Sequence, residues 1–256
     1  MRNTSLMKWL VVAAAVAQIF GAWWPAGAGF GQSVAARSAL VSTPATPAGY
    51  AFAIWGLIFA AALAFAVYQL VTRAEAELRE VRAPFAVACA ANAAWEIYVQ
   101  FRAIDLVSAV IIAGGLAAAL SALLAAGKST TPRLSRQGLL VLAPTGLTAG
   151  WLGVAAFANA AAVLKGAGAT SATSEALIAG VLIAAASLLA AVVALRSPGR
   201  FWYGAAAAWG LIAVVVRKLG PDGSGIVLTV ASAGVAVVAL AVVVGELGRM
   251  RRAASG

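Results

Sequence analysis

The chain has 256 residues, of which 63% are hydrophobic and 10% are charged, and its formal net charge is +10. A soluble domain is about half apolar and about a quarter charged, so the composition excludes a water-soluble globular protein and indicates one embedded in lipid. The sequence has no histidine and a single cysteine, Cys89, which excludes His-ligated haem, the common His-based metal sites and an internal disulfide.

Eight hydrophobic segments follow one another along the chain, and most match the roughly 20 residues that a bilayer requires. They lie at about 6–24, 50–71, 83–101, 105–126, 138–164, 175–195, 201–217 and 225–246. Because these runs are rich in Ala, Leu and Val, we predict an all-α polytopic membrane protein and not a β-barrel. The first segment could also be a signal peptide, since Arg2 and Lys8 precede it, but its length favours a retained helix.

The basic residues predict how the helices are oriented. With eight spans, thirteen of the 18 Lys and Arg residues fall on the amino-terminal side and five on the other. The larger set is Arg2, Lys8, Arg73, Arg79, Arg82, Lys128, Arg133, Arg136, Arg196, Arg200, Arg249, Arg251 and Arg252, and the smaller is Arg37, Arg102, Lys165, Arg217 and Lys218. Cytoplasmic loops carry the excess of positive charge, so we expect both termini on the cytoplasmic side of a cell (inner) membrane. Contact with anionic membrane lipids explains the net charge better than a nucleic-acid partner does.

The second segment carries an aromatic stripe. Phe52, Trp55 and Phe59 are spaced i, i+3 and i+7, which places them on one face of a helix. This stripe could form a stacking wall for a flat apolar ligand, or it could serve helix packing and lipid contact.

The third segment carries three side chains with polar groups. Asn92, Trp95 and Glu96 are spaced i, i+3 and i+4, so we expect them to share a face. Within a membrane such groups must meet protein, water or ligand. Glu96 is the one carboxylate well inside a predicted span, which makes it a candidate for ligand or proton binding. It could also reach the interface or pair with Arg102.

The fifth segment combines a helix breaker with small residues. Pro144 removes one helical hydrogen bond, so we expect it to kink or start the helix. Gly146 and Gly150 form a GxxxG pattern, which permits close approach of a neighbouring helix. Trp151 and Asn159 lie on one broad face after them.

Three stretches in this order resemble the TspO/MBR family, the tryptophan-rich sensory proteins related to the mitochondrial translocator protein. Residues 39–49, leading into Trp55, resemble the family's Pro-rich loop with W-x-P-P-G and the V/I-W motif after it. Residues 92–95 resemble the third helix's L-N-x-x-W, and residues 151–159 resemble the fifth helix's W-x-x-F-A-x-x-L-N. The resemblance covers about residues 6–165.

The resemblance implies a five-helix membrane bundle whose cavity binds flat apolar ligands, especially porphyrins. The matching cavity positions are Trp55, Asn92, Trp95, Trp151 and Asn159, and the loop over the cavity mouth matches at Thr46, Pro47 and Gly49. With Phe52 and Glu96 from the reasoning above, these are the candidate ligand-binding residues. The expected domains are a core at 1–165 and a three-helix extension at 166–256.

The sequence departs from the family pattern at several positions. Ala45 stands in place of the loop tryptophan and Ala48 in place of its second proline, while Glu96 replaces an apolar residue or proline. Pro144 stands seven residues before Trp151, where the family has about four. These departures leave the ligand open and indicate a diverged, enlarged relative.

Two further functions are compatible with the sequence. Eight segments are enough for a small-solute permease, in which Glu96 could couple transport to protons. The last three segments could instead dock a membrane-protein partner, as in an accessory or scaffold subunit, and the chain could also form a homodimer. Because P-loops, nucleophile elbows and metal-spaced clusters are missing, we expect no enzyme and no required cofactor or metal.

Overall fold

The computed structural model describes residues 2–73, 75–127, 132–197, 199–220 and 223–254. Eight long helices run through them: α1 (Arg2–Gly27), α3 (Ile54–Val71), α4 (Glu75–Phe101), α5 (Leu106–Ala126), α6 (Ala143–Gly166), α7 (Glu175–Arg196), α8 (Arg200–Lys218) and α9 (Gly225–Ala254). Three shorter elements join them: α2 (Val34–Leu40), the 3-10 helix η1 (Gly49–Ala53) and the π-helix η2 (Gly138–Leu142). The predicted all-α membrane fold is confirmed. Lys128, which entered the orientation prediction, lies outside the described residues, as do the side chains of Arg2 and Arg252.

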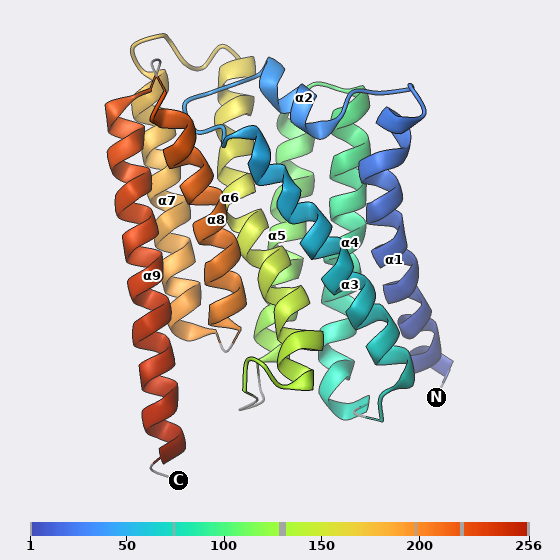
Figure 1. Cartoon of the computed structure of the whole chain (residues 1–256). Helices are drawn as coiled ribbons and strands as arrows, with labels where there is room; N and C mark the ends of the chain where they lie inside the picture. The colour runs from blue at the N-terminus through green and yellow to red at the C-terminus, as the bar shows by residue number, and fades with distance from the viewer. Residues whose placement is uncertain (1, 74, 128–131, 198, 221–222, 255–256) are drawn as a thin grey trace.

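Six of the described helices are long and apolar enough to cross a membrane: α1, α3 with η1, α5, α6 with η2, α7 and α9. The other two, α4 and α8, lie alongside them but carry charges toward their ends. Both termini lie at the same end of the bundle (Figure 1), as an even number of crossings requires. Which end faces the cytoplasm stays a prediction.

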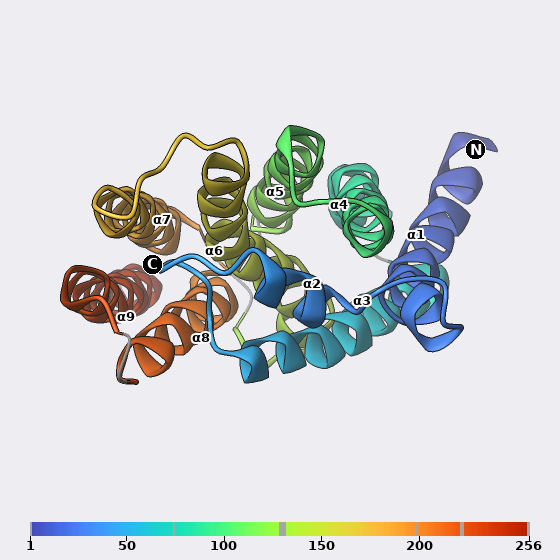
Figure 2. The same ribbon diagram turned by 90° about the horizontal axis from the view of Figure 1, so that it is seen from above.

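Helix α6 lies in the middle of the molecule and separates two groups of helices. Seen from above, α1, α3, α4 and α5 lie on one side of it and α7, α8 and α9 on the other (Figure 2). All residues from 143 to 154 are buried. Small side chains make this central position possible, because they let neighbouring helices approach closely on every side.

The GxxxG pattern of α6 faces α8. A Cβ atom on Gly146 would lie 2.8 Å from Cβ of Trp202, and one on Gly150 would lie 3.0 Å from Cβ of Ala206 and overlap the carbonyl oxygen of Tyr203. The predicted close approach is therefore present, and it joins the central helix α6 to the group formed by α7, α8 and α9. In lipid, helices associate chiefly through such van der Waals packing.

Pro144 marks the start of α6, as the sequence predicts. The π-helix η2 ends at Leu142 and α6 begins one residue later, with Pro144 in its first turn. Because proline has no backbone N–H, it cannot continue the hydrogen-bond ladder of the preceding turn. A side-chain hydrogen bond links η2 and α6 instead: the hydroxyl of Thr145 donates to the carbonyl of Val141 (2.7 Å).

We predict that Gly150→Ala destabilises the protein, although alanine is the better helix former. Its Cβ would meet backbone of α8, which has no free space to move into, and such overpacking costs about 1–3 kcal/mol. Thermal unfolding in detergent should show a lower Tm. The matched control is Gly114→Ala on α5, whose Cβ would meet nothing within 4 Å and which should leave the Tm unchanged or raise it. Equal Tm values for the two variants would contradict the assigned α6–α8 contact.

Candidate functional site

A small cavity lies beneath α2 and the stretch that follows it, at the end of the bundle opposite the two termini. We call residues 41–53, which include η1, the covering segment. The free volume of the cavity is about 50 Å³, and its wall is mostly apolar. Six of the candidate residues line it: Thr46, Pro47, Phe52, Trp95, Trp151 and Asn159. The structure thus brings together side chains from the covering segment, α4 and α6.

The aromatic wall of the cavity differs in one member from the expected set. Phe52 lies edge-on to Trp151, with ring centroids 6.1 Å apart, and Trp95 adds a third ring from α4. Trp55 does not line the cavity. Its ring meets the edge of Trp151 at 5.9 Å and stacks on Phe59 at 5.5 Å. The α3 part of the stripe, Trp55 and Phe59, therefore serves packing and supports Trp151 from behind, whereas Phe52 of η1 lines the cavity.

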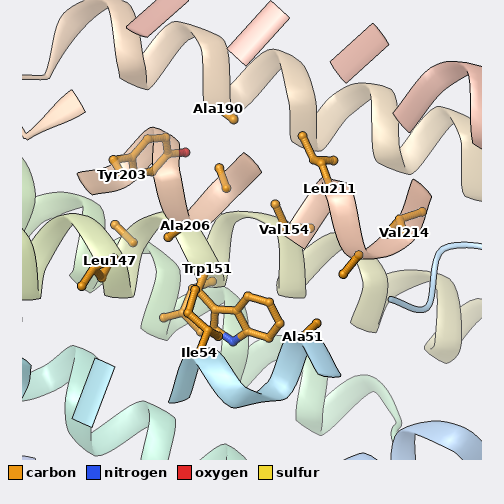
Figure 3. Packing of buried hydrophobic residues seen from close by; sticks show 14 of the residues in the cluster. Ala51, Ile54, Leu147, Trp151, Val154, Ala190, Tyr203, Ala206, Leu211 and Val214 are labelled. Atoms are coloured by element: carbon orange, nitrogen blue, oxygen red, sulfur yellow. The ribbon is translucent and has the colours of Figure 1, made fainter. Parts of the chain in front are cut away.

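Trp151 sits where three elements of the core meet. Figure 3 shows its ring pointing from α6 toward Ala51 of η1 and Ile54 at the start of α3, with Ala206 of α8 on the other side of the α6 backbone. The side chain belongs to the main hydrophobic core and is buried. Its surroundings therefore hold the ring in one orientation beside the cavity.

Several hydrogen-bond donors beside the cavity have no partner among the described residues. They are the indole nitrogens of Trp95 and Trp151 and the amide nitrogen of Asn159, all buried. The amide oxygen of Asn159 accepts a hydrogen bond from the Ser108 hydroxyl (3.3 Å), which holds this side chain in place. A buried donor left without a partner costs about 1–3 kcal/mol. A bound molecule with acceptor atoms would remove that cost.

The covering segment is folded by its own hydroxyl groups. The side chain of Thr46 accepts a hydrogen bond from the backbone N–H of Thr43 (2.9 Å), and the Thr43 hydroxyl accepts one from the N–H of Ala45 (3.2 Å). Ala45, which stands in place of the family's loop tryptophan, is fully buried. Gly49 does not line the cavity, and a Cβ there would meet nothing within 4 Å.

Asn92 and Glu96 are turned away from the cavity, toward α1. The amide of Asn92 donates to Oε1 of Gln18 (3.2 Å) and lies 3.5 Å from Oε1 of Glu96. Successive residues of a helix point about 100° apart, so Trp95 and Glu96 meet different neighbours although they are adjacent. Glu96 is buried, and no described ion pair joins it to Arg102.

A second glutamine completes this polar cluster, which we define as Gln18, Asn92, Glu96 and Gln100. Gln100 donates to the carbonyl of Gly21 (2.6 Å) and accepts from the N–H of residue 26 (3.1 Å). The cluster therefore ties α1 to α4 at several levels. Sequence reasoning missed both glutamines, although the spacing of 92, 96 and 100 by four residues places them on one helix face.

Asp105 was also missed, and it supports the cavity from the start of α5. Its carboxylate accepts from the backbone N–H groups of Val107 (3.0 Å) and Ser108 (3.1 Å), and its own N–H donates to the Ser108 hydroxyl. The Tyr98 hydroxyl also donates to it (2.7 Å). This last hydrogen bond is the main reason why the pKa of Asp105 lies below its ordinary value. The Asp-x-x-Ser spacing is the capping signal that could have identified it.

The comparisons with known proteins agree with the resemblance seen in the motifs. A family model described as TSPO-like protein matches residues 8–244 of the chain. The matched range continues past residue 165 through α7 and α8 and into α9. No curated protein and no solved structure matches the chain. The division into a core and an extension at residue 165 stays a prediction.

We predict that Asp105 makes the stability of the bundle depend on pH in the acid range. Its folded pKa lies below its unfolded value of about 3.9, so its contribution is present above that value and is lost as the pH falls through the folded pKa. Asp105→Ala removes the cap and should lower stability at pH 7 by about 1 kcal/mol. Unfolding in detergent between pH 7 and pH 3 measures both effects. Wild type and variant should converge at low pH, and a constant difference would contradict the assignment.

Proposed function

The chain belongs to the family of TSPO-like proteins, and from that premise we propose that it binds a flat apolar small molecule of the tetrapyrrole class beneath the covering segment. Binding would serve a sensor, carrier or regulator and would require no metal or further cofactor. One observation carries the proposal: Phe52, Trp95 and Trp151 converge from three elements on a cavity that also presents Asn159. Aromatic rings offer flat apolar area, and a few polar groups fix orientation, as in most small-molecule sites.

The polar atoms beside the cavity support a ligand that carries acceptor groups. The unpartnered atoms of Trp95, Trp151 and Asn159 are all N–H donors. An apolar ring system with carbonyl or carboxylate oxygens at its edge would satisfy them while its face stacks on the aromatic wall. A pure hydrocarbon would leave those donors buried and unpaired.

The size of the cavity indicates how such a ligand would bind. Drug-sized ligands occupy pockets of about 300–1,000 Å³, whereas the free volume here is about 50 Å³. We infer that the structure is the closed form of the site and that the site enlarges on binding. The walls from α4 and α6 are packed helices, so the covering segment is the part that has to move.

Titration of the purified protein with protoporphyrin in mild detergent, followed by tryptophan fluorescence and the Soret band, tests the proposal. Quenching together with a Soret shift at micromolar ligand is the expected result. The absence of both signals at that concentration would refute tetrapyrrole binding.

We predict that Trp151→Phe weakens this binding about five-fold, because the aromatic contact is largely kept but one donor of about 1 kcal/mol is lost. The matched control is Trp202→Phe on α8, whose indole nitrogen is also unpartnered but which does not line the cavity. The Kd should be unchanged in the control. A Kd that is equally weakened in both variants would show that the effect does not come from the cavity.

A further inference from the structure

The covering segment is fastened to α8 along its inner part. The indole N–H of Trp209 donates to the carbonyl of Ala51 (3.0 Å), and the same ring meets Tyr50 edge-on at 5.4 Å. One turn further along α8, the carbonyl of Ala213 accepts a hydrogen bond from the backbone N–H of Ala48 (3.0 Å). Two of these contacts use backbone groups of the segment, so they depend on its position and not on its side chains.

The outer part of the segment is fastened at Ser42. The guanidinium group of Arg217 donates to the Ser42 hydroxyl (2.7 Å). The ammonium group of Lys165 at the end of α6 donates to the Ser42 carbonyl (2.8 Å) and pairs with Glu175 (2.8 Å). All these side chains lie at the same end of the bundle as the cavity.

The contacts on α8 form a single row. Trp209, Ala213 and Arg217 are spaced by four residues, which places them on one face of the helix. In the described part of the chain, hydrogen bonds join the covering segment to all three residues of this row and to Lys165. The segment runs antiparallel to the row, from Ser42 at Arg217 to Ala51 at Trp209.

We propose that the row on α8 is a latch that holds the covering segment closed, and that ligand enters the cavity when these contacts break. This inference rests on the proposed function and adds its regulation: α8, one of the three helices that follow residue 165, controls access to a site built by the others. The glycine contact with α6 holds α8 at the distance that the latch requires. Since each hydrogen bond lost changes an opening equilibrium by a factor of about five, the row can keep the open form rare.

Cysteine accessibility tests the latch without any ligand. Ala162 lines the cavity and is buried, so an Ala162→Cys reporter in a Cys89→Ala background is shielded when the segment is closed. We expect slow alkylation by a soluble maleimide, measured by mass spectrometry. Trp209→Phe keeps an aromatic ring beside Tyr50 but removes the donor to Ala51, and it should raise the rate about five-fold. Arg217→Gln should also raise it, and the double variant should react fastest.

Two controls match the latch variants. Trp202→Phe alters a tryptophan of the same helix, and Arg102→Gln alters an arginine at the same end of the bundle, and neither residue contacts the covering segment in the described structure. Their alkylation rates should equal that of the reporter alone. The latch is contradicted if the double latch variant is alkylated no faster than the reporter alone. Fast alkylation of the reporter alone would contradict it as well.

A ligand experiment separates this inference from the proposed function. Stopped-flow mixing with protoporphyrin should show faster association in the double latch variant than in the control variants. Faster alkylation with unchanged association would overturn the claim that ligand enters through the segment. If protoporphyrin does not bind at all, the proposed function fails, while the alkylation rates still decide whether α8 holds the segment.

Discussion

The close approach of α6 and α8 is the contact on which the rest of the structure depends. Gly146 and Gly150 leave no side chain between the two backbones, so α8 packs directly on the central helix. In lipid there is no hydrophobic force between helices, so close packing and interhelical hydrogen bonds decide which faces meet. Once Tyr203 and Ala206 are seated there, the rest of α8 has to run beside η1 and the covering segment. The position of the latch row beside the covering segment therefore depends on this contact.

Polar groups divide into two kinds in this bundle. Gln18 and Gln100 belong to a cluster that lies between α1 and α4, where the amides donate to one another and to backbone carbonyls. Such bonds hold helices together at roughly 0.6–2 kcal/mol each. The side chains of Trp95, Trp151 and Asn159 differ because they line the cavity; buried atoms without a described partner occur both there and within the cluster. Their position on the cavity wall, and not the lack of a partner, separates them from the polar groups that tie helices together.

The small volume of the cavity and the hydrogen bonds of the covering segment together indicate how a ligand would gain access to the site. Helices that are packed against α6 cannot separate without losing large buried surfaces, whereas a turn and a short 3-10 helix can move as a unit. The segment is held by hydrogen bonds to α8 and to Lys165 of α6 and by the burial of Ala45 and Ala51, and its opening exposes only this short stretch of chain. Access to the site is therefore governed by a helix that contributes no residue to the cavity lining. In this proposal α8 regulates access to the cavity, while α4, α6 and the covering segment form it.

The sequence by itself determined the class of protein, the eight long helices, the family and six of the residues that line the cavity. These followed from local properties: apolar runs of spanning length, a proline that starts α6, and motifs that place Trp95, Trp151 and Asn159 at helical spacing. The tertiary structure alone decided that Glu96 faces α1, that Trp55 supports Trp151 from behind, and that Trp209 holds the covering segment. The physical reason is that periodicity tells which residues share a helix face, but the neighbour that each face meets depends on how all the helices pack.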